Sequence, residues 1–390
     1  MDFWLTTEQE SFLGEVREFL DQELTRDAVR EVASAEKMGP NAKAFLKKLA
    51  DKGWISLHWP KEYGGMGRSA YDRFLLSEEL AYQGAPGAAT SNTGGRIVAP
   101  VIIMFGADEQ KERFLGPIAD GEIDFALGYT EPDAGSDLAS LQMRAELDGD
   151  HYVVSGQKMF NTACHFAPYH WLAVRTDPDA PKHRGISLMI VDLKSPGITI
   201  DPVWTMADER TNAVYYDQVR VPRGNLIGEP NQGFYYLAKA LEFERMLVTG
   251  DIRRYFDRLL NHLRDQSAES PESSPASNPL VRQRVAQIAI ELQVARQLSH
   301  KIAWLVTTGD AARREASVLK LFKTELTQHM AKTAIEIFGL YGQVERGSIH
   351  AQMNGRPPQD YLRGVSSTIT GGTSEVQRNV IATRGLGLPR

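Results

Sequence analysis

Apolar and polar positions recur at helical spacing through the first third of the chain. Residues 6–24 carry apolar side chains three or four positions apart, which predicts an amphipathic helix along this stretch. Thr6 and Gln9 stand at the spacing of a capping box, in which each side chain satisfies the other's backbone N–H at the helix start. A glycine-rich turn at 63–67 interrupts the pattern. Further helical segments are predicted at 45–49, 74–80, 97–105 and 109–118.

The middle of the chain has a different pattern, made of short runs of β-branched and aromatic residues. Turn residues such as Asp148-Gly149 separate these runs, which is typical of strands joined by tight turns. The clearest predicted strands lie at 152–154, 186–191 and 213–221. We therefore expect a sheet domain in this region.

Long stretches of helical period return after residue 231, with lengths suited to a helix bundle. They cover residues 231–262, 280–307 and 311–338. Residues 267–279 are dense in Ser, Pro and Glu, so no packed core is expected there and a mobile loop is predicted.

These changes of pattern predict an α+β protein with three domains. We expect an N-terminal helical domain over residues 1–123, a middle domain of β-barrel-like or sandwich form over 124–228, and a C-terminal four-helix bundle over 229–390. No G-x-G-x-x-G follows a predicted strand, which excludes the usual dinucleotide-binding fold. A nucleotide cofactor must therefore bind in another way.

Composition narrows the class of function. The chain has 390 residues and a formal net charge of −6, so it lacks the excess of Lys and Arg that nucleic acid or an anionic membrane surface requires. Its one cysteine, Cys164, excludes an intrachain disulfide, and the scattered histidines lack the spacing of metal ligands. No stretch approaches the roughly 20 apolar residues of a membrane-spanning helix, and no apolar leader follows a basic start. We expect a cytoplasmic protein that acts on small molecules, without a bound metal.

Three segments carry candidate chemistry. The first, L-G-Y-T-E-P-D-A-G-S-D at 127–137, combines a turn with hydroxyl groups and backbone N–H donors, which suits an anionic or carbonyl-rich ligand. The second is G-Q-K-M-F-N-T at 156–162, and the third is G-G-T-S-E-V-Q-R at 371–378. Taken alone, Phe160 is explained equally well as an aromatic side chain of the core as it is as a cofactor contact. In the same way, Gly371-Gly372 is explained equally well as the end of a helix. The three segments together indicate a bound cofactor.

With these segments in this order, the chain resembles the acyl-CoA dehydrogenase family along essentially its whole length. The resemblance implies the three-domain fold, bound FAD, and removal of two hydrogens across the α,β bond of an acyl-CoA thioester. Phe160 would pack against the isoalloxazine ring, and the Thr162 hydroxyl would bond near its N5 atom. Matched position by position, the implied flavin contacts are Leu127, Tyr129, Thr130, Ser136, Phe160, Thr162, Thr373 and Glu375, and the implied acyl-CoA contacts are Ser136, Arg245 and Gly372.

The general base must be a carboxylate, because the α-proton of a thioester is hard to remove at neutral pH. In the largest branch of the family this Glu stands two positions before the Thr of G-T-S, where the present chain has Gly371. In a second branch, which resembles the isovaleryl, long-chain and sterol side-chain enzymes, the catalytic Glu stands directly before an Arg. Arg245 matches that Arg, so the resemblance implies Glu244 as the base. Glu242 would point about 200° away on a helix, so it cannot share the site. The backbone N–H of Gly371 is expected to act as an oxyanion donor.

The missing side chain at Gly371 frees volume, so we expect a branched, cyclic or otherwise bulky acyl group. The reaction would pass the β-hydride to flavin N5 and give a trans-2-enoyl-CoA. The resemblance implies an electron-transfer flavoprotein as the acceptor. Two alternatives stay open, an acyl-CoA oxidase that uses dioxygen and a non-catalytic partner subunit of a mixed assembly. The competing interpretation of Glu244 is that it is an ordinary exposed carboxylate on a helix, without a catalytic role.

The resemblance also implies an oligomer, either a homotetramer or homodimer or a hetero-oligomer. One family feature is missing, because relatives carry an R-x-x-F-G motif that reaches the FAD of a neighbouring subunit. The Ser/Pro-rich stretch occupies that place here, and Arg282 and Arg284 are the candidates to replace the contact.

Overall fold

The computed structural model describes residues 4–33, 38–88, 92–244, 247–272, 274–310 and 312–389, without the side chains of 241–244. The chain falls into two compact units. The bundle unit consists of Met1–Leu13, Phe74–Gln83 and Arg245–Arg390. The sheet unit consists of Gly14–Arg73 and Gly84–Glu244.

Helices form the N-terminal region, as the apolar spacing predicts. The expected capping box is present, because Thr6 N–H donates to Gln9 Oε1 at 3.0 Å and Gln9 N–H donates to Thr6 Oγ1 at 3.2 Å. All of the predicted helical segments lie in helices. The segment 97–105 begins in a π-helical turn, Gly94–Val98, and continues into an α-helix. The helices are α1 (Thr7–Glu23), α2 (Arg26–Ala33), α3 (Pro40–Asp51), α4 (Ala70–Gln83), α5 (Ala99–Phe105) and α6 (Asp108–Ala119).

Seven strands form one sheet in the order β1-β4-β2-β3-β7-β6, with β5 paired to β4. β1 pairs parallel with β4, whereas β4 pairs antiparallel with β5. The three predicted strand segments lie in β3, β5 and β7. The strands are β1 (Phe125–Gly128), β2 (Arg144–Asp148), β3 (His151–Lys158), β4 (Tyr169–Arg175), β5 (Ile186–Asp192), β6 (Ile198–Trp204) and β7 (Arg210–Pro222).

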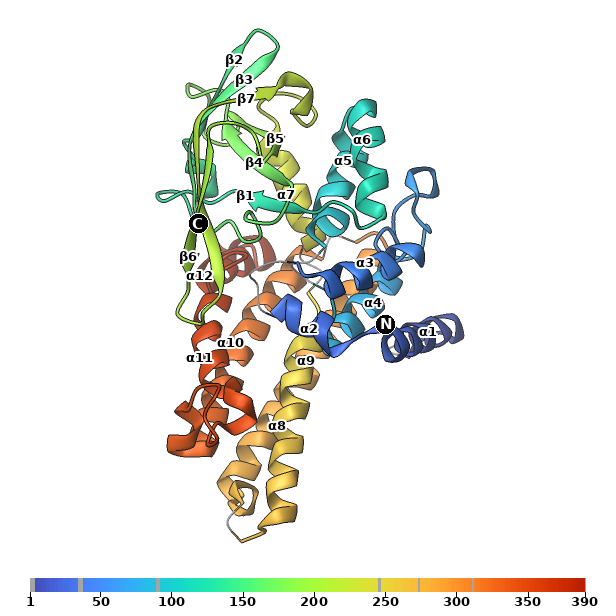
Figure 1. Ribbon diagram of the computed structural model, residues 1–390, viewed down its shortest axis with the longest axis vertical. Helices are drawn as coiled ribbons and strands as arrows, with labels where there is room; N and C mark the ends of the chain where they lie inside the picture. Colours follow the sequence, from blue (N-terminus) through green and yellow to red (C-terminus); the bar gives the residue numbers. More distant parts are fainter. Residues whose placement is uncertain are drawn as a thin grey trace. The chain divides into compact units, whose positions relative to one another are not determined.

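Strand β4, which pairs with β1, β2 and β5, is buried on both faces. Trp171 and Ala173 face an apolar cluster that also contains residues of α5, α6 and α7 (Gly233–Glu244). Leu172 and Val174, each one position along, face a second cluster lined by β2, β3 and β7. The strand period of two thus places helices against one side of β4 and the curled sheet against the other (Figure 1).

The C-terminal region is helical, as predicted. α10 packs against α9, α11 and α12, and α8 packs against α9 (Figure 1). None of the helices in the described parts of the chain is long and apolar enough to cross a membrane. The domain boundaries at 123/124 and 228/229 stay a prediction. The helices are α8 (Gly250–Glu269), α9 (Pro279–Thr307), α10 (Arg313–Phe338), α11 (Arg356–Ser367) and α12 (Ser374–Val380).

Two expectations for this region are wrong. The predicted helical stretch 231–262 is two helices, α7 and α8, because a buried carboxylate, that of Glu78, accepts the N–H of Thr249 at 2.7 Å at the start of α8. For residues 267–279 the lack of packing is the wrong part, because α8 extends to Glu269 and Ser274 is buried, while the predicted mobility stays a prediction. The Ser274 hydroxyl is 2.7 Å from that of Ser267 and caps a short 3-10 turn, which gives these polar residues local partners.

Candidate active site

The first predicted cofactor segment leaves β1 and turns back on itself. Backbone groups of Glu131 and Ala134 bond to each other in both directions, at 3.1 and 3.2 Å, which closes a tight turn. Leu127 and Tyr129 are half-buried against the apolar cluster beneath the helices, whereas Ser136 is exposed on the turn. The turn therefore exposes hydroxyl and backbone groups, while the residues before it are packed against the apolar cluster.

The second predicted cofactor segment follows β3 and lies beside the first. Met159 N–H donates to Thr130 O at 2.8 Å, which joins the two segments directly. Phe160 has a φ of 58°, a costly conformation for a bulky side chain, and is 60% exposed. Asn161 N–H donates to Asn212 O at 2.9 Å, and the Asn212 side chain donates to Asn161 O at 2.8 Å. These bonds hold the strained backbone in place.

This geometry fits a planar cofactor. An aromatic side chain is normally buried, so a ring held at the surface on a constrained backbone is suited to packing against another ring. Thr162 is exposed two positions after Phe160, with its hydroxyl 3.4 Å from that of Thr211. The two segments that sequence motifs single out are thus neighbours in space, as a shared flavin site requires.

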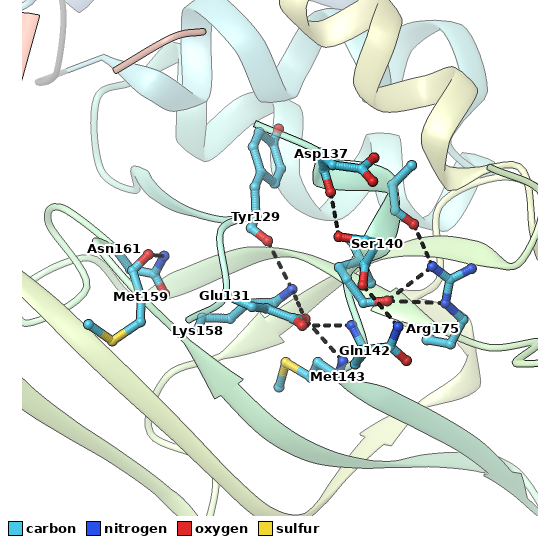
Figure 2. A network of polar contacts seen from close by, with 12 residues as sticks. Tyr129, Glu131, Asp137, Ser140, Gln142, Met143, Lys158, Met159, Asn161 and Arg175 are labelled. Carbon is cyan, nitrogen blue, oxygen red and sulfur yellow. Dashed lines mark hydrogen bonds and ion pairs between the residues drawn. The ribbon is translucent and has the colours of Figure 1, made fainter. Parts of the chain in front are cut away.

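A buried ion pair lies beneath the two segments (Figure 2). Lys158 Nζ is 2.8 Å from Glu131 Oε1, and the two side chains are 0% and 8% exposed. Burial lowers the pKa of Lys158 to about 8, and the Glu131 charge opposes this shift. Both residues stand within the motifs, but the pairing was not predicted, because 27 positions separate them in sequence. Arg175, also buried, donates to Ala139 O at 2.7 Å, two positions after the end of the first segment.

The third predicted segment belongs to the bundle unit. Gly371 and Gly372 have φ values of 67° and 91°, a region that favours glycine. The Thr373 hydroxyl accepts the N–H of Val376 at 3.2 Å and so caps α12. Glu375 is exposed in the first turn of that helix, where backbone hydrogen bonding lowers the pKa of its carboxyl.

Little surrounds the position where the common family base would stand. Apart from its two chain neighbours, a Cβ added at Gly371 would approach no described atom more closely than Lys320 Cε, at 4.0 Å. Within the bundle unit this corner is therefore open, and no carboxylate projects from position 371 itself.

The proposed base is described only by its backbone. Glu244 is the last residue of α7 in the sheet unit, while its side chain and all of Arg245 lie outside the described residues. That Glu244 and Gly371 meet over one flavin therefore stays a prediction. Of the two candidate substitutes for the R-x-x-F-G contact, Arg284 donates to Glu336 at 2.8 Å on the surface of the bundle, and Arg282 is exposed.

Three family models match the chain in succession. They are described as the N-terminal, middle and C-terminal domains of acyl-CoA dehydrogenase, over residues 6–122, 126–219 and 231–386. Acyl-CoA dehydrogenase FadE26 of Mycobacterium tuberculosis is 35% identical, over 99% of this chain and 98% of its own length.

Solved structures match over the full length as well. One described as "Tcur3481-Tcur3483 steroid ACAD" is 34% identical with a TM-score of 0.91, and 100% of each chain is covered. A chain of the ChsE4-ChsE5 complex from Mycobacterium tuberculosis is 35% identical with a TM-score of 0.87, again over 100% of each chain.

The fold and the paired cofactor segments define a flavoprotein oxidoreductase. More narrowly, the chain belongs to the acyl-CoA dehydrogenase family, and it is an FAD-dependent enzyme that dehydrogenates an acyl-CoA thioester. The predicted family, fold class, cofactor and type of reaction are thereby confirmed.

Proposed function

We propose that Glu244 is the general base that removes the α-proton of the bound thioester. The observation that carries this proposal is the open corner at Gly371, which leaves the third cofactor segment without the carboxylate usual in the family. Glu244 is well supported for such a role, because α7 is anchored by Leu237 and Ala240 in the apolar core of the sheet unit. A base at the end of a packed helix keeps a defined position.

Loss of the α-proton places negative charge on the thioester carbonyl, which needs fixed hydrogen-bond donors. The backbone N–H of Gly371 is the proposed donor, since the N–H remains when the side chain is absent. FAD, when bound, supplies the acceptor for the β-hydrogen. Phe160 and Thr162 would orient the flavin ring, while Thr130, Ser136 and Thr373 would contribute polar contacts to the cofactor.

We infer that the acyl group is bulky, in the manner of a branched chain or a ring system. The open corner at Gly371 supports this, because the missing side chain removes volume next to the proposed reaction centre. The relative described as "Tcur3481-Tcur3483 steroid ACAD" suggests a steroid-type acyl group as the first class to examine. An electron-transfer flavoprotein is the proposed acceptor of the electrons.

The base is tested by Glu244→Gln, with Glu242→Gln as the matched control on the same helix. Loss of an essential base should lower the rate of flavin reduction by roughly three orders of magnitude, while FAD and acyl-CoA binding persist. Stopped-flow measurement of flavin bleaching reports that rate, and visible absorption reports bound FAD. A Glu244→Gln enzyme that bleaches at the normal rate would reject the assignment.

The substrate class is tested with a panel of acyl-CoA thioesters. Branched and ring-bearing acyl groups should bleach the flavin faster than straight short chains, because they fill the open corner. Gly371→Ala should selectively slow the bulky members of the panel. Equal rates across short straight chains, with none on branched or ring substrates, would contradict the proposal.

A further inference from the structure

Lys158 is a cation enclosed in the sheet unit at the end of β3. Its Nζ atom donates to two acceptors, Glu131 Oε1 at 2.8 Å and the backbone carbonyl of Tyr129 at 3.1 Å (Figure 2). The Glu131 carboxylate has its own set of donors, the N–H groups of Gln142 at 2.6 Å and Met143 at 3.0 Å. One buried ion pair therefore ties together three separate stretches of backbone.

The bond to Tyr129 O fixes the direction of a peptide group in the first cofactor segment. A trans peptide is planar, with its C=O and N–H pointing to opposite sides. Because the carbonyl of Tyr129 points at the buried ammonium, the N–H of Thr130 points away from it. The next carbonyl, Thr130 O, accepts from Met159 N–H at 2.8 Å, so Lys158 and its neighbour orient two consecutive peptides.

Stability alone gives a poor account of this arrangement. A buried ion pair is costly to desolvate, and its replacement by apolar side chains of similar size is often neutral or stabilising. Arg175 repeats the pattern, because its enclosed guanidinium donates to Leu141 O at 3.0 Å and Ala139 O at 2.7 Å. One buried cation thus holds a backbone carbonyl within the first cofactor segment, and a second holds carbonyls just after it.

We propose that Lys158 is a positioning residue for FAD, with Glu131 as its counter-ion. Lys158 holds the 129–130 peptide in the orientation that presents the Thr130 N–H to the cofactor, and it does so without touching the cofactor. This inference rests on the proposed placement of FAD against Thr130 and Phe160.

Three variants separate positioning from stability. Lys158→Met removes the donor and leaves Glu131 charged and unpaired, so the melting temperature of the apo-protein should fall by about 10 °C. Glu131→Gln leaves Lys158 free to donate to Tyr129 O, and its FAD dissociation constant should stay within about threefold of the wild type. The double variant Glu131→Gln/Lys158→Met removes both members of the ion pair, and Asp177 still compensates the nearby charge of Arg175, so it should regain most of the lost melting temperature.

FAD affinity decides between the two roles. In the double variant, titration of apo-protein with FAD, followed by flavin fluorescence, should still show a dissociation constant roughly ten- to a hundredfold above the wild type. Recovery of both stability and affinity would overturn the inference. Arg220→Gln is the control, because it removes a cation from the exposed ion pair with Asp148 on the same sheet. It should change neither quantity.

Phe160→Ala distinguishes failure of this inference from failure of the proposed site. If Phe160→Ala weakens FAD binding and the double variant does not, Lys158 has no positioning role and the site stands. If Phe160→Ala leaves FAD binding unchanged, the proposed placement of the cofactor is itself wrong, and the inference falls with it.

Discussion

Lys158 and Phe160 stand two positions apart and have opposite surroundings. The Lys158 side chain is completely enclosed, whereas Phe160 is 60% exposed. Residues two apart on a continuing strand would share a face. Here β3 ends at Lys158, and the φ of 58° at Phe160 redirects the chain, so that a cation stays inside while an aromatic ring reaches the surface. Strain at Phe160 thereby exposes the ring that we propose contacts the flavin, and hydrogen bonds between Asn161 and Asn212 maintain this conformation.

Another buried residue, His170, predicts a dependence of stability on pH. Its Nδ1 lies 2.7 Å from Tyr216 OH within the sheet, and burial lowers its pKa to about 3. The unfolded chain takes up a proton below the ordinary pKa of about 6.5, while the folded chain does not. Stability attributable to His170 is therefore lost as the pH falls below about 6.5, by about 2–3 kcal/mol near pH 4.5.

His170→Gln should flatten that dependence, because glutamine keeps a hydrogen-bonding group but does not titrate. Urea unfolding at several pH values between about 7 and 4.5 measures the slope. The exposed His350→Gln is the control and should leave the slope as it is. Part of the slope should persist, since burial also lowers the pKa values of His58 and His300. An unchanged slope in His170→Gln would contradict the assignment.

At the scale of elements, the break between α7 and α8 is the main departure from the sequence pattern. In the bundle unit, the buried Glu78 of α4 accepts the N–H of Thr249 at 2.7 Å and its hydroxyl at 2.9 Å. Arg253 on α8 lies 3.8 Å from the same carboxylate. Gly250 permits this close packing, because a Cβ there would lie 2.2 Å from Glu78 O. A contact from another helix thus sets where α8 begins.

Glu78→Ala should lower the free energy of unfolding by about 3–5 kcal/mol, because it leaves two donors of Thr249 without their acceptor and removes one of the two carboxylates near Arg253, the other being Glu79 at 3.5 Å. Glu269→Ala, at the exposed end of α8, is the matched control. Denaturant unfolding of both variants measures the difference. A loss no greater than that of the control would mean that Glu78 does not anchor the start of α8.

At the scale of the whole molecule, the prediction concerns assembly. The sequence leaves a homo-oligomer and a hetero-oligomer as alternatives for this chain, and one solved relative is described as the ChsE4-ChsE5 complex. We expect this chain, purified alone, to be an oligomer. We also expect it to carry FAD, because a subunit that only completes an assembly has no need of Thr130, Ser136 and Thr162. Light scattering with visible absorption tests both points. A colourless chain that acquires flavin only with a second chain would support the partner-subunit alternative instead.

The reduced flavin must pass its electrons to an acceptor outside this chain. A dehydrogenase should turn over rapidly with a ferrocenium-type acceptor and slowly with air, whereas an oxidase should show the reverse. Comparison of the two rates on one acyl-CoA separates the alternatives directly.

Local regularities made much of this protein predictable. The helical period, the strand runs and the Thr6–Gln9 capping box depend on residues only a few positions apart, so the amino-acid sequence by itself determined most elements and the three-part order. The motifs at 127–137, 156–162 and 371–378 indicated FAD for the same reason, since each is continuous in sequence.

Long-range contacts decided the rest. The strand order, the start of α8 at Glu78, and the burial of Lys158 against Glu131 all join residues far apart along the chain. Sequence pattern reports whether a side chain suits burial, but the partner that makes a buried charge tolerable is chosen only when distant segments pack together.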